Sequence, residues 1–208
     1  MDFISTLALG LGSAWVSGIN LYAAVAALGL LGRFGNLPLP GDLTVLTSGW
    51  VIGVASGLYV VEFVADKVPL VDSAWDFIHT FIRVPAGAVL AAGAFGDFDR
   101  SLQVIAFLLG GTLALGSHGT KATARAAINT SPEPFSNIGA SLLEDGVAVG
   151  SIFLAAFFPV LMLILLLVFT VLAIIFLPRI FAFFRRQIAR VRAKKGGRPG
   201  TARSILRR

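Results

Sequence analysis

The sequence contains no cysteine, and charged side chains make up only 13% of its 208 residues. The absence of cysteine excludes disulfides, thiolate catalysis and Cys-ligated metal sites. Soluble domains carry about 25% charged residues, so a fraction half as large indicates a membrane protein. Histidine occurs twice, and no zinc-binding spacing, Ser-His-Asp order, P-loop or dinucleotide fingerprint is present. We therefore expect no cofactor and no enzymatic activity.

Apolar runs fill most of the chain, which is 56% hydrophobic. Several runs reach the roughly 20 residues that a helix needs to cross a bilayer. They predict an all-α fold, a polytopic transmembrane bundle of about six spans, near residues 4–31, 43–64, 72–96, 102–115, 135–158 and 160–177. Residues 72–96 have two interpretations, one crossing with a kink or a re-entrant pair of short helices, and we favour the kinked crossing.

Basic residues are concentrated at the C-terminal end. From residue 179 onward the sequence holds 11 of its 17 Lys and Arg residues and no acid. This pattern divides the chain into a bundle over 1–178 and a basic tail over 179–208, which starts as an amphipathic helix and ends as a disordered segment. The positive-inside bias puts the tail in the cytoplasm, and an even number of spans puts the N-terminus there too. We expect the tail to bind anionic lipid and expect no nucleic-acid partner.

The stretch over residues 62–83 joins two apolar segments yet is rich in charge. At about 100° per residue, Asp72, Asp76, His79 and Arg83 lie within a roughly 60° stripe of one helix. A charged edge among membrane spans must face water, protein or a ligand. Two interpretations stay open: the acids and His79 form a proton relay, or these side chains hydrogen-bond one another.

Two adjacent acids, Glu144 and Asp145, lie near the centre of the predicted fifth span. Charged and unpaired, they would cost several kcal/mol. One interpretation is that they bind a cation or a proton; the other is that they pair with Lys121 or Arg125 and hold the bundle together. Because adjacent residues point about 100° apart on a helix, one acid can be functional and the other structural.

A second pair of acids, Glu62 and Asp66, lies four residues apart on one helical face beside Lys67. Their oxygens suit a hard cation such as Mg²⁺, Ca²⁺ or Na⁺, which leaves the metal, if any, undefined. The alternative is an ion pair at the edge of the bilayer. Four basic residues and the second histidine have two interpretations. They neutralise these acids, or they form a site for an anion or a lipid headgroup. These residues are Lys67, Arg83, His118, Lys121 and Arg125.

Five residues are expected to break helices within the membrane. Asn20 interrupts the first span, and Asn137 stands beside another break, where each would satisfy free backbone groups. Pro85 is expected to end or kink its helix, and Pro132 and Pro134 to break the chain before the fifth span. Residues 76–93 can be laid against 122–143 as an internal repeat, an arrangement known from transporters with sites at mid-membrane.

Several segments resemble one known family. They are SGINLY (17–22), LLGRFG (30–35), VEFVADKVPLVDSAWDFIHTFIR (61–83), PAGA (85–88), NTSPEPFSN (129–137) and SLLED (141–145). Together they are similar to a bacterial family of membrane proteins described as domain of unknown function 4126, over about residues 10–178. The resemblance implies a polytopic protein of the bacterial inner membrane and implies no activity.

Three functions are compatible with these patterns. The first is a transporter or channel for an inorganic ion or small solute, with or without proton coupling, in which Glu62, Asp66, Asp72, Asp76, His79, Glu144 and Asp145 form the site. The second is a membrane scaffold or assembly factor whose charged stripes contact a partner protein. The third, a lipid-acting enzyme, ranks last because no nucleophile–base pair is visible. So small a bundle is also compatible with a homo-oligomer.

Overall fold

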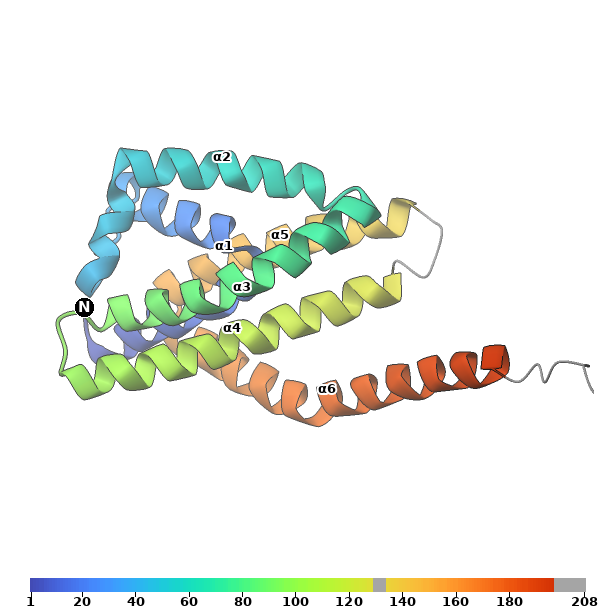
Figure 1. Cartoon of the computed structure of the whole chain (residues 1–208). Helices are drawn as coiled ribbons and strands as arrows, with labels where there is room; N and C mark the ends of the chain where they lie inside the picture. Colours follow the sequence, from blue (N-terminus) through green and yellow to red (C-terminus); the bar gives the residue numbers. More distant parts are fainter. Residues whose placement is uncertain (129–133, 197–208) are drawn as a thin grey trace, which may run out of the picture.

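The computed structural model describes residues 1–128 and 134–196, and this part of the chain is helical with no strand. Figure 1 shows the arrangement of its elements. They are α1 (Phe3–Phe34), the 3₁₀-helix η1 (Gly41–Thr47), α2 (Gly49–Ala65), α3 (Pro69–Ala94), α4 (Arg100–Ile128), α5 (Pro134–Phe157) and α6 (Pro159–Gly196). By length and composition, five described helices could cross a membrane, namely α3–α6 and α1 when it is taken as one unbroken element of 32 residues, and η1 with α2 forms a sixth candidate bent by 74°. The protein is therefore a multi-pass membrane protein, as the apolar runs predict.

Helix α1 is broken at Asn20. This residue has an extended backbone conformation (φ −149°, ψ 99°) inside an otherwise helical segment. Its side-chain oxygen accepts a 2.9 Å hydrogen bond from the backbone N–H of Ala23, which is the geometry of an N-cap. Asn20 thus ends the first arm of α1, residues 3–19, and starts the second arm, residues 21–34.

The two arms of α1 form a V whose open ends lie at the same end of the bundle (Figure 1). The ring of Phe3 packs on Phe98 at 5.9 Å, and the N–H of Gly41 donates to Asp97 in the same α3–α4 loop. Gly41 follows Phe34 by only seven positions, a reach of at most about 25 Å, whereas a straight α1 would be about 48 Å long. Each arm is about 20–25 Å long, too short to cross the hydrocarbon core of about 30 Å.

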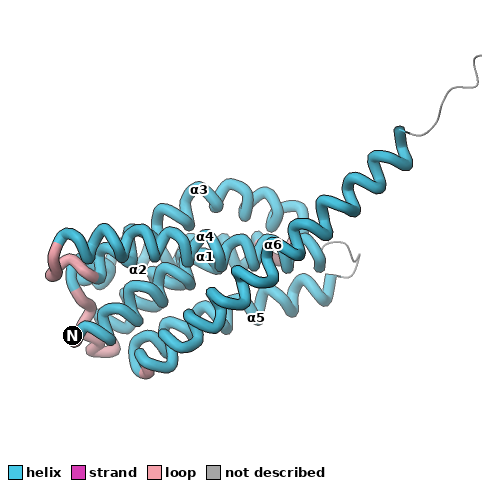
Figure 2. Tube along the Cα trace, turned by 90° about the horizontal axis from the view of Figure 1, so that it is seen from below, coloured by secondary structure: helices cyan, strands magenta, loops and turns pink. Residues whose placement is uncertain are grey.

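The fold-back of α1 changes the predicted topology. Helices α2 to α6 run the length of the bundle in alternating directions, and the N-terminus and the end of α6 lie at opposite ends (Figures 1 and 2). The prediction that both termini lie on one side is therefore wrong. It assumed that the first apolar run crosses the membrane, but the arms separated by Asn20 turn back instead.

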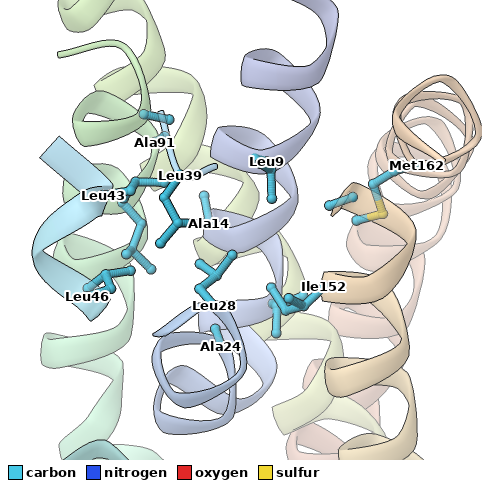
Figure 3. Close-up of a cluster of buried hydrophobic side chains, with 14 of the residues drawn as sticks. Leu9, Ala14, Ala24, Leu28, Leu39, Leu43, Leu46, Ala91, Ile152 and Met162 are labelled. Carbon is cyan, nitrogen blue, oxygen red and sulfur yellow. The ribbon is translucent and has the colours of Figure 1, made fainter. Parts of the chain in front are cut away.

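The apolar core lies between the arms of α1 and their neighbours. Leu9 and Leu28, one from each arm, are fully buried, as are Ile152 of α5 and Met162 of α6 (Figure 3). Small residues let the helices approach closely at these contacts, since a Cβ on Gly18 would collide with the Ala114 carbonyl and the Ser117 hydroxyl of α4. The core therefore holds α1 centrally, in contact with every other helix.

Three element boundaries differ from the sequence-based expectation. Helix α3 continues through Pro85 to Ala94, so this proline does not end the helix. Residues 74–94 form one candidate crossing, in agreement with the favoured interpretation of this stretch and not with a re-entrant pair. Helix α4 is a single element that extends beyond the predicted fourth span and carries His118, Lys121 and Arg125 in its second half. Helix α6 starts at Pro159, between the predicted fifth and sixth spans, and continues past Pro178 to Gly196.

Candidate functional site

The tip of α1 meets charged side chains from four other helices. Glu62 and Asp66 come from the end of α2, Asp76 and Arg83 from α3, Lys121 and Arg125 from α4, and Glu144 and Asp145 from α5. All of them are buried except Glu144, whose side chain is 18% exposed. We call these eight residues the charged cluster. It occupies the half of the bundle opposite the N-terminus, next to the break in α1.

Arg83 is the most enclosed member of the charged cluster, with no exposed surface. Its Nη2 donates to Glu62 Oε1 at 2.6 Å, and its Nη1 donates to Asp76 Oδ1 at 2.8 Å. Nη1 also lies 3.3 Å from His118 Nδ1. Because a guanidinium can only donate, Nδ1 accepts here, which leaves the His118 proton on Nε2, 2.7 Å from Thr80 Oγ1.

Lys121 joins the charged cluster to the broken backbone of α1. Its ammonium donates to the Ile19 carbonyl at 3.1 Å, next to the break, where the helix no longer satisfies its own carbonyl groups. The same nitrogen lies within 4 Å of one carboxylate oxygen from each of four acids: Glu62 (3.9 Å), Asp66 (3.4 Å), Asp76 (3.7 Å) and Glu144 (3.5 Å). A single base therefore connects α1 to α2, α3 and α5.

Arg125 binds Glu144 with two nitrogens, Nε to Oε1 at 2.9 Å and Nη2 to Oε2 at 2.7 Å. Its Nη1 donates to Asn137 Oδ1 at 2.6 Å. The Asn137 amide in turn donates to the Asp66 carbonyl at 3.0 Å. Asn137 was expected to cap a break beside its own helix; instead it lies in the first turn of α5 and satisfies the carboxyl end of α2.

Asp145 differs from the other acids of the charged cluster, because it forms no ion pair with any residue that the structure describes. Its side chain is 7% exposed. Oδ1 accepts a 3.1 Å hydrogen bond from the Asn20 amide, and Oδ2 accepts none from the described residues. The adjacent acids thus separate as their 100° offset allows: Glu144 binds Arg125, while Asp145 faces the break in α1.

Acids outnumber bases in the charged cluster by five to three, and by five to four when the half-buried Lys67 is counted. Besides Asp145 Oδ2, two other buried carboxylate oxygens, Glu62 Oε2 and Asp66 Oδ1, accept no hydrogen bond from the described residues. A buried charge is costly unless it is paired and hydrogen-bonded. The charged cluster therefore has more negative charge than its own bases neutralise.

The two histidines do not contact the predicted stripe in the same way. His118 joins Arg83 to Thr80, as described above. His79 Nε2 lies 3.0 Å from the Tyr22 hydroxyl and Nδ1 lies 2.8 Å from the Trp75 carbonyl, so its partners are not the acids of its own stripe. Tyr22 was missed by the sequence analysis, although it stands in the SGINLY segment.

The remaining predicted site residues lie at the edge of the charged cluster or outside the described residues. The Lys67 ammonium donates to the Phe63 carbonyl at 2.7 Å and lies 3.0 Å from the centre of the Phe63 ring. Asp72 belongs to α3, and Pro134 starts α5, but their side chains lie outside the described residues, and so does all of Pro132. The second half of the proposed internal repeat crosses residues 129–133 and is likewise not covered.

Within the described residues, no three His, Asp or Glu side chains are placed to hold a metal ion together. Glu62 and Asp66, the pair predicted to suit a hard divalent cation, each lie against basic side chains instead. The geometry therefore supports the ion-pair interpretation for these two acids, and it leaves Asp145 as the acid that needs another partner.

Fold and site together define a polytopic helical membrane protein with a buried, net acidic charged cluster at the tip of a broken helix. The chain matches the model of the family described as domain of unknown function (DUF4126) over residues 7–179, and it belongs to that family. No curated protein and no solved structure matches the chain.

Proposed function

We propose that this protein is a transporter that moves a cation or small cationic solute across the membrane in exchange for protons, with Asp145 as the exchanging acid. The observation that carries the proposal is the burial of Asp145 without an ion-pair partner among the described residues. An isolated carboxylate at this depth costs several kcal/mol when charged. Either a bound proton or a bound cation removes that cost.

Competition between these two occupants gives exchange. Both neutralise the same carboxylate, so both cannot be held at once without leaving excess positive charge. Binding of a cation at Asp145 then favours release of the proton, and binding of a proton favours release of the cation. The other acids are less suited to this role, because Glu62, Asp76 and Glu144 accept direct hydrogen bonds from arginine.

The break in α1 supports the proposal through its direct bond to Asp145. Irregular backbone at membrane depth occurs where it is buried in protein or lines a cavity, and broken helices commonly form transporter sites. The Asn20 amide binds Asp145 while the Asn20 oxygen caps the second arm. A change of occupant at Asp145 is thereby transmitted to the joint between the two arms.

The orientation in the membrane forms part of the proposal. The basic residues beyond position 179 favour a cytoplasmic end for α6, and the opposite position of the N-terminus then places Met1 on the other side. Reporter fusions test this topology: a reporter that is active only in the cytoplasm should work at the C-terminus and fail at the N-terminus. Activity at both ends would contradict the fold-back of α1.

Proton flux in proteoliposomes tests the transport itself. Purified protein is reconstituted with a pH dye inside, and gradients of Na⁺, K⁺, Li⁺ and small organic cations are applied in turn. At least one gradient should move protons in the wild type and none in Asp145→Asn, while Asp42→Asn, which removes an exposed acid from η1, should behave like the wild type. The proposal fails if no cation moves protons beyond the protein-free control, or if Asp145→Asn transports normally.

A scaffold function is the alternative, and the dense ion pairing of the charged cluster favours it. Four of its acids lie within 4 Å of a base, as expected for a structural core. On this account Asp145→Asn would leave the protein folded and equally able to capture a partner, and no solute would bind. Glu144→Gln, which frees Arg125, would instead weaken partner capture.

A further inference from the structure

A groove of about 270 Å³ lies beside the charged cluster, between α4 and α5. Trp15 and Ile19 of α1 and Phe169 of α6 contribute to its walls, and Lys121 and Glu144 are its charged residues. The remaining lining is almost entirely apolar, with Leu143 and Val147 as examples. Both of these side chains are exposed on a helix of a membrane protein, so the groove opens toward the lipid.

Two aromatic rings and a carboxylate border this groove. Trp15 and Phe169 form an edge-to-face pair with ring centres 5.2 Å apart. The faces of aromatic rings attract cations, and cages of aromatic rings recognise quaternary ammonium groups. Glu144 is the acid of the charged cluster with the greatest exposure, 18% of its side chain, so it is the acid that a molecule in the groove meets first.

The net charge of the charged cluster favours a ligand with a positively charged headgroup. Glu144 itself is bound by Arg125, but the charged cluster as a whole, Glu144 included, holds five acids and three bases. The three carboxylate oxygens that accept no hydrogen bond from the described residues belong to acids behind the groove, not in its lining. An anionic headgroup would add to this negative excess, whereas a cationic headgroup would reduce it. An apolar body attached to the cation would bury its surface against Leu143 and Val147.

We propose that the groove binds a hydrophobic ammonium cation, a molecule with an apolar tail and one positive head, which enters from the bilayer. This inference goes beyond the proposed transport function, because Asp145, the exchanging acid, does not line the groove. It rests on that function only for the movement of the bound molecule from the groove toward Asp145. The head lies between Glu144 and the Trp15–Phe169 pair, and the tail lies along the lipid-facing part of the groove.

Three probes with one tail and different heads test the charge selection. Decyltrimethylammonium, decyl sulfate and decyl maltoside are titrated below their micelle-forming concentrations into the full chain in nanodiscs of zwitterionic lipid, with empty nanodiscs as the blank. The cation should bind at least tenfold more tightly than the anion and the neutral probe. Equal binding of all three would show a groove filled by any alkyl chain and would overturn the proposal.

A matched pair of variants tests the position. Ala124 lines the groove and Ala126 does not, and both are exposed alanines on α4. Ala124→Trp should abolish decyltrimethylammonium binding, and Ala126→Trp should leave it unchanged. Phe169→Leu keeps the apolar volume and should weaken binding by about three- to tenfold through the lost ring. Equal binding to both tryptophan variants would place the probe elsewhere and overturn the assignment.

The binding assay separates this proposal from the transport function. Saturable, Ala124-dependent binding of the cation without any proton flux would support the groove and defeat the transporter. Proton flux driven by Na⁺ or K⁺, with no binding of decyltrimethylammonium, would support the transporter and defeat the groove as its solute site.

Discussion

The half of the bundle that holds the N-terminus is filled by leucine, alanine and phenylalanine, whereas the other half contains eight ionisable side chains around the tip of α1. In the first half, removal of a side chain leaves a cavity, and the cost depends on its volume. In the second half, removal of one charged group leaves its partners buried without compensation. The two halves should therefore respond differently to single and double substitutions.

The largest effect is expected at Arg83. Arg83→Met leaves Glu62 and Asp76 without their arginine and should lower the free energy of unfolding by about 4 kcal/mol. Denaturant unfolding of the purified protein in detergent measures the change. Adding Glu62→Gln should restore part of the loss, because one uncompensated carboxylate is removed. Arg33→Met, at a base that bonds the Thr47 carbonyl on the surface, serves as the control. If the double variant were no more stable than the single one, charge compensation would not be the cause.

A cavity in the apolar half should cost slightly less. Leu28 is fully buried in the second arm of α1, and Leu28→Ala should lower the free energy of unfolding by about 3 kcal/mol. In contrast to Arg83→Met, this loss should not be rescued by Glu62→Gln. The same unfolding assay provides the measurement, and rescue by Glu62→Gln would show that the two halves are not independent.

A smaller effect on stability is expected at Asn20, the break in α1 that lies between the two halves of the bundle. Asn20→Ala removes the N-cap of the second arm, a change that typically costs about 1 kcal/mol, and it also removes the hydrogen bond that the Asn20 amide donates to Asp145. We expect modest destabilisation with a large loss of proton flux. Thr112→Ala, whose exposed hydroxyl bonds within its own turn, is the matched control. Normal flux in Asn20→Ala would mean that the break does not sense Asp145.

The smallest effect on stability is expected at a surface carboxylate, because water solvates its charge in both the folded and the unfolded state. Asp99 accepts a 2.7 Å hydrogen bond from the Ser101 backbone N–H before α4, and this bond lowers the pKa of the Asp99 carboxyl. A lowered pKa in the folded state stabilises the protein at pH values above the unfolded pKa of about 3.9, and the stabilisation is lost as the pH falls through the folded pKa. Asp99→Ala should therefore reduce stability slightly at pH 7 and have no effect at strongly acidic pH. An equal difference at both pH values would exclude the carboxylate as its source.

Part of this structure could be predicted from the sequence. The helical class follows from apolar runs, the break at Asn20 from its poor helix propensity, and the turn before Pro159 from a charge-free run too long for one span. The fold-back of α1 could not be predicted, because residues 21–34 are as apolar as a crossing helix. The continuation of α3 through Pro85 agrees with the favoured interpretation of residues 72–96 as one crossing, although the local pattern alone also allowed a re-entrant pair.

The charged residues were identified more readily than their partners. The helical stripe indicated Arg83, since residues three or four apart share a face, and the need for counter-charges indicated Lys121 and Arg125. Which acid each base binds depends on how four helices meet. For the same reason the sequence left Glu144 and Asp145 equivalent, and only the position of Arg125 relative to α5 separates them.

Proton release is the most direct test of the central claim that Asp145 exchanges a proton for a cation. Purified protein in weakly buffered detergent solution is titrated with NaCl and, separately, with decyltrimethylammonium chloride, and the pH is recorded. If Asp145 exchanges a proton for a cation, at least one of these cations should cause a saturable release of protons that approaches one per chain, is absent in Asp145→Asn and is present in Asp42→Asn. Binding of either cation without proton release, or equal release from Asp145→Asn, would contradict it.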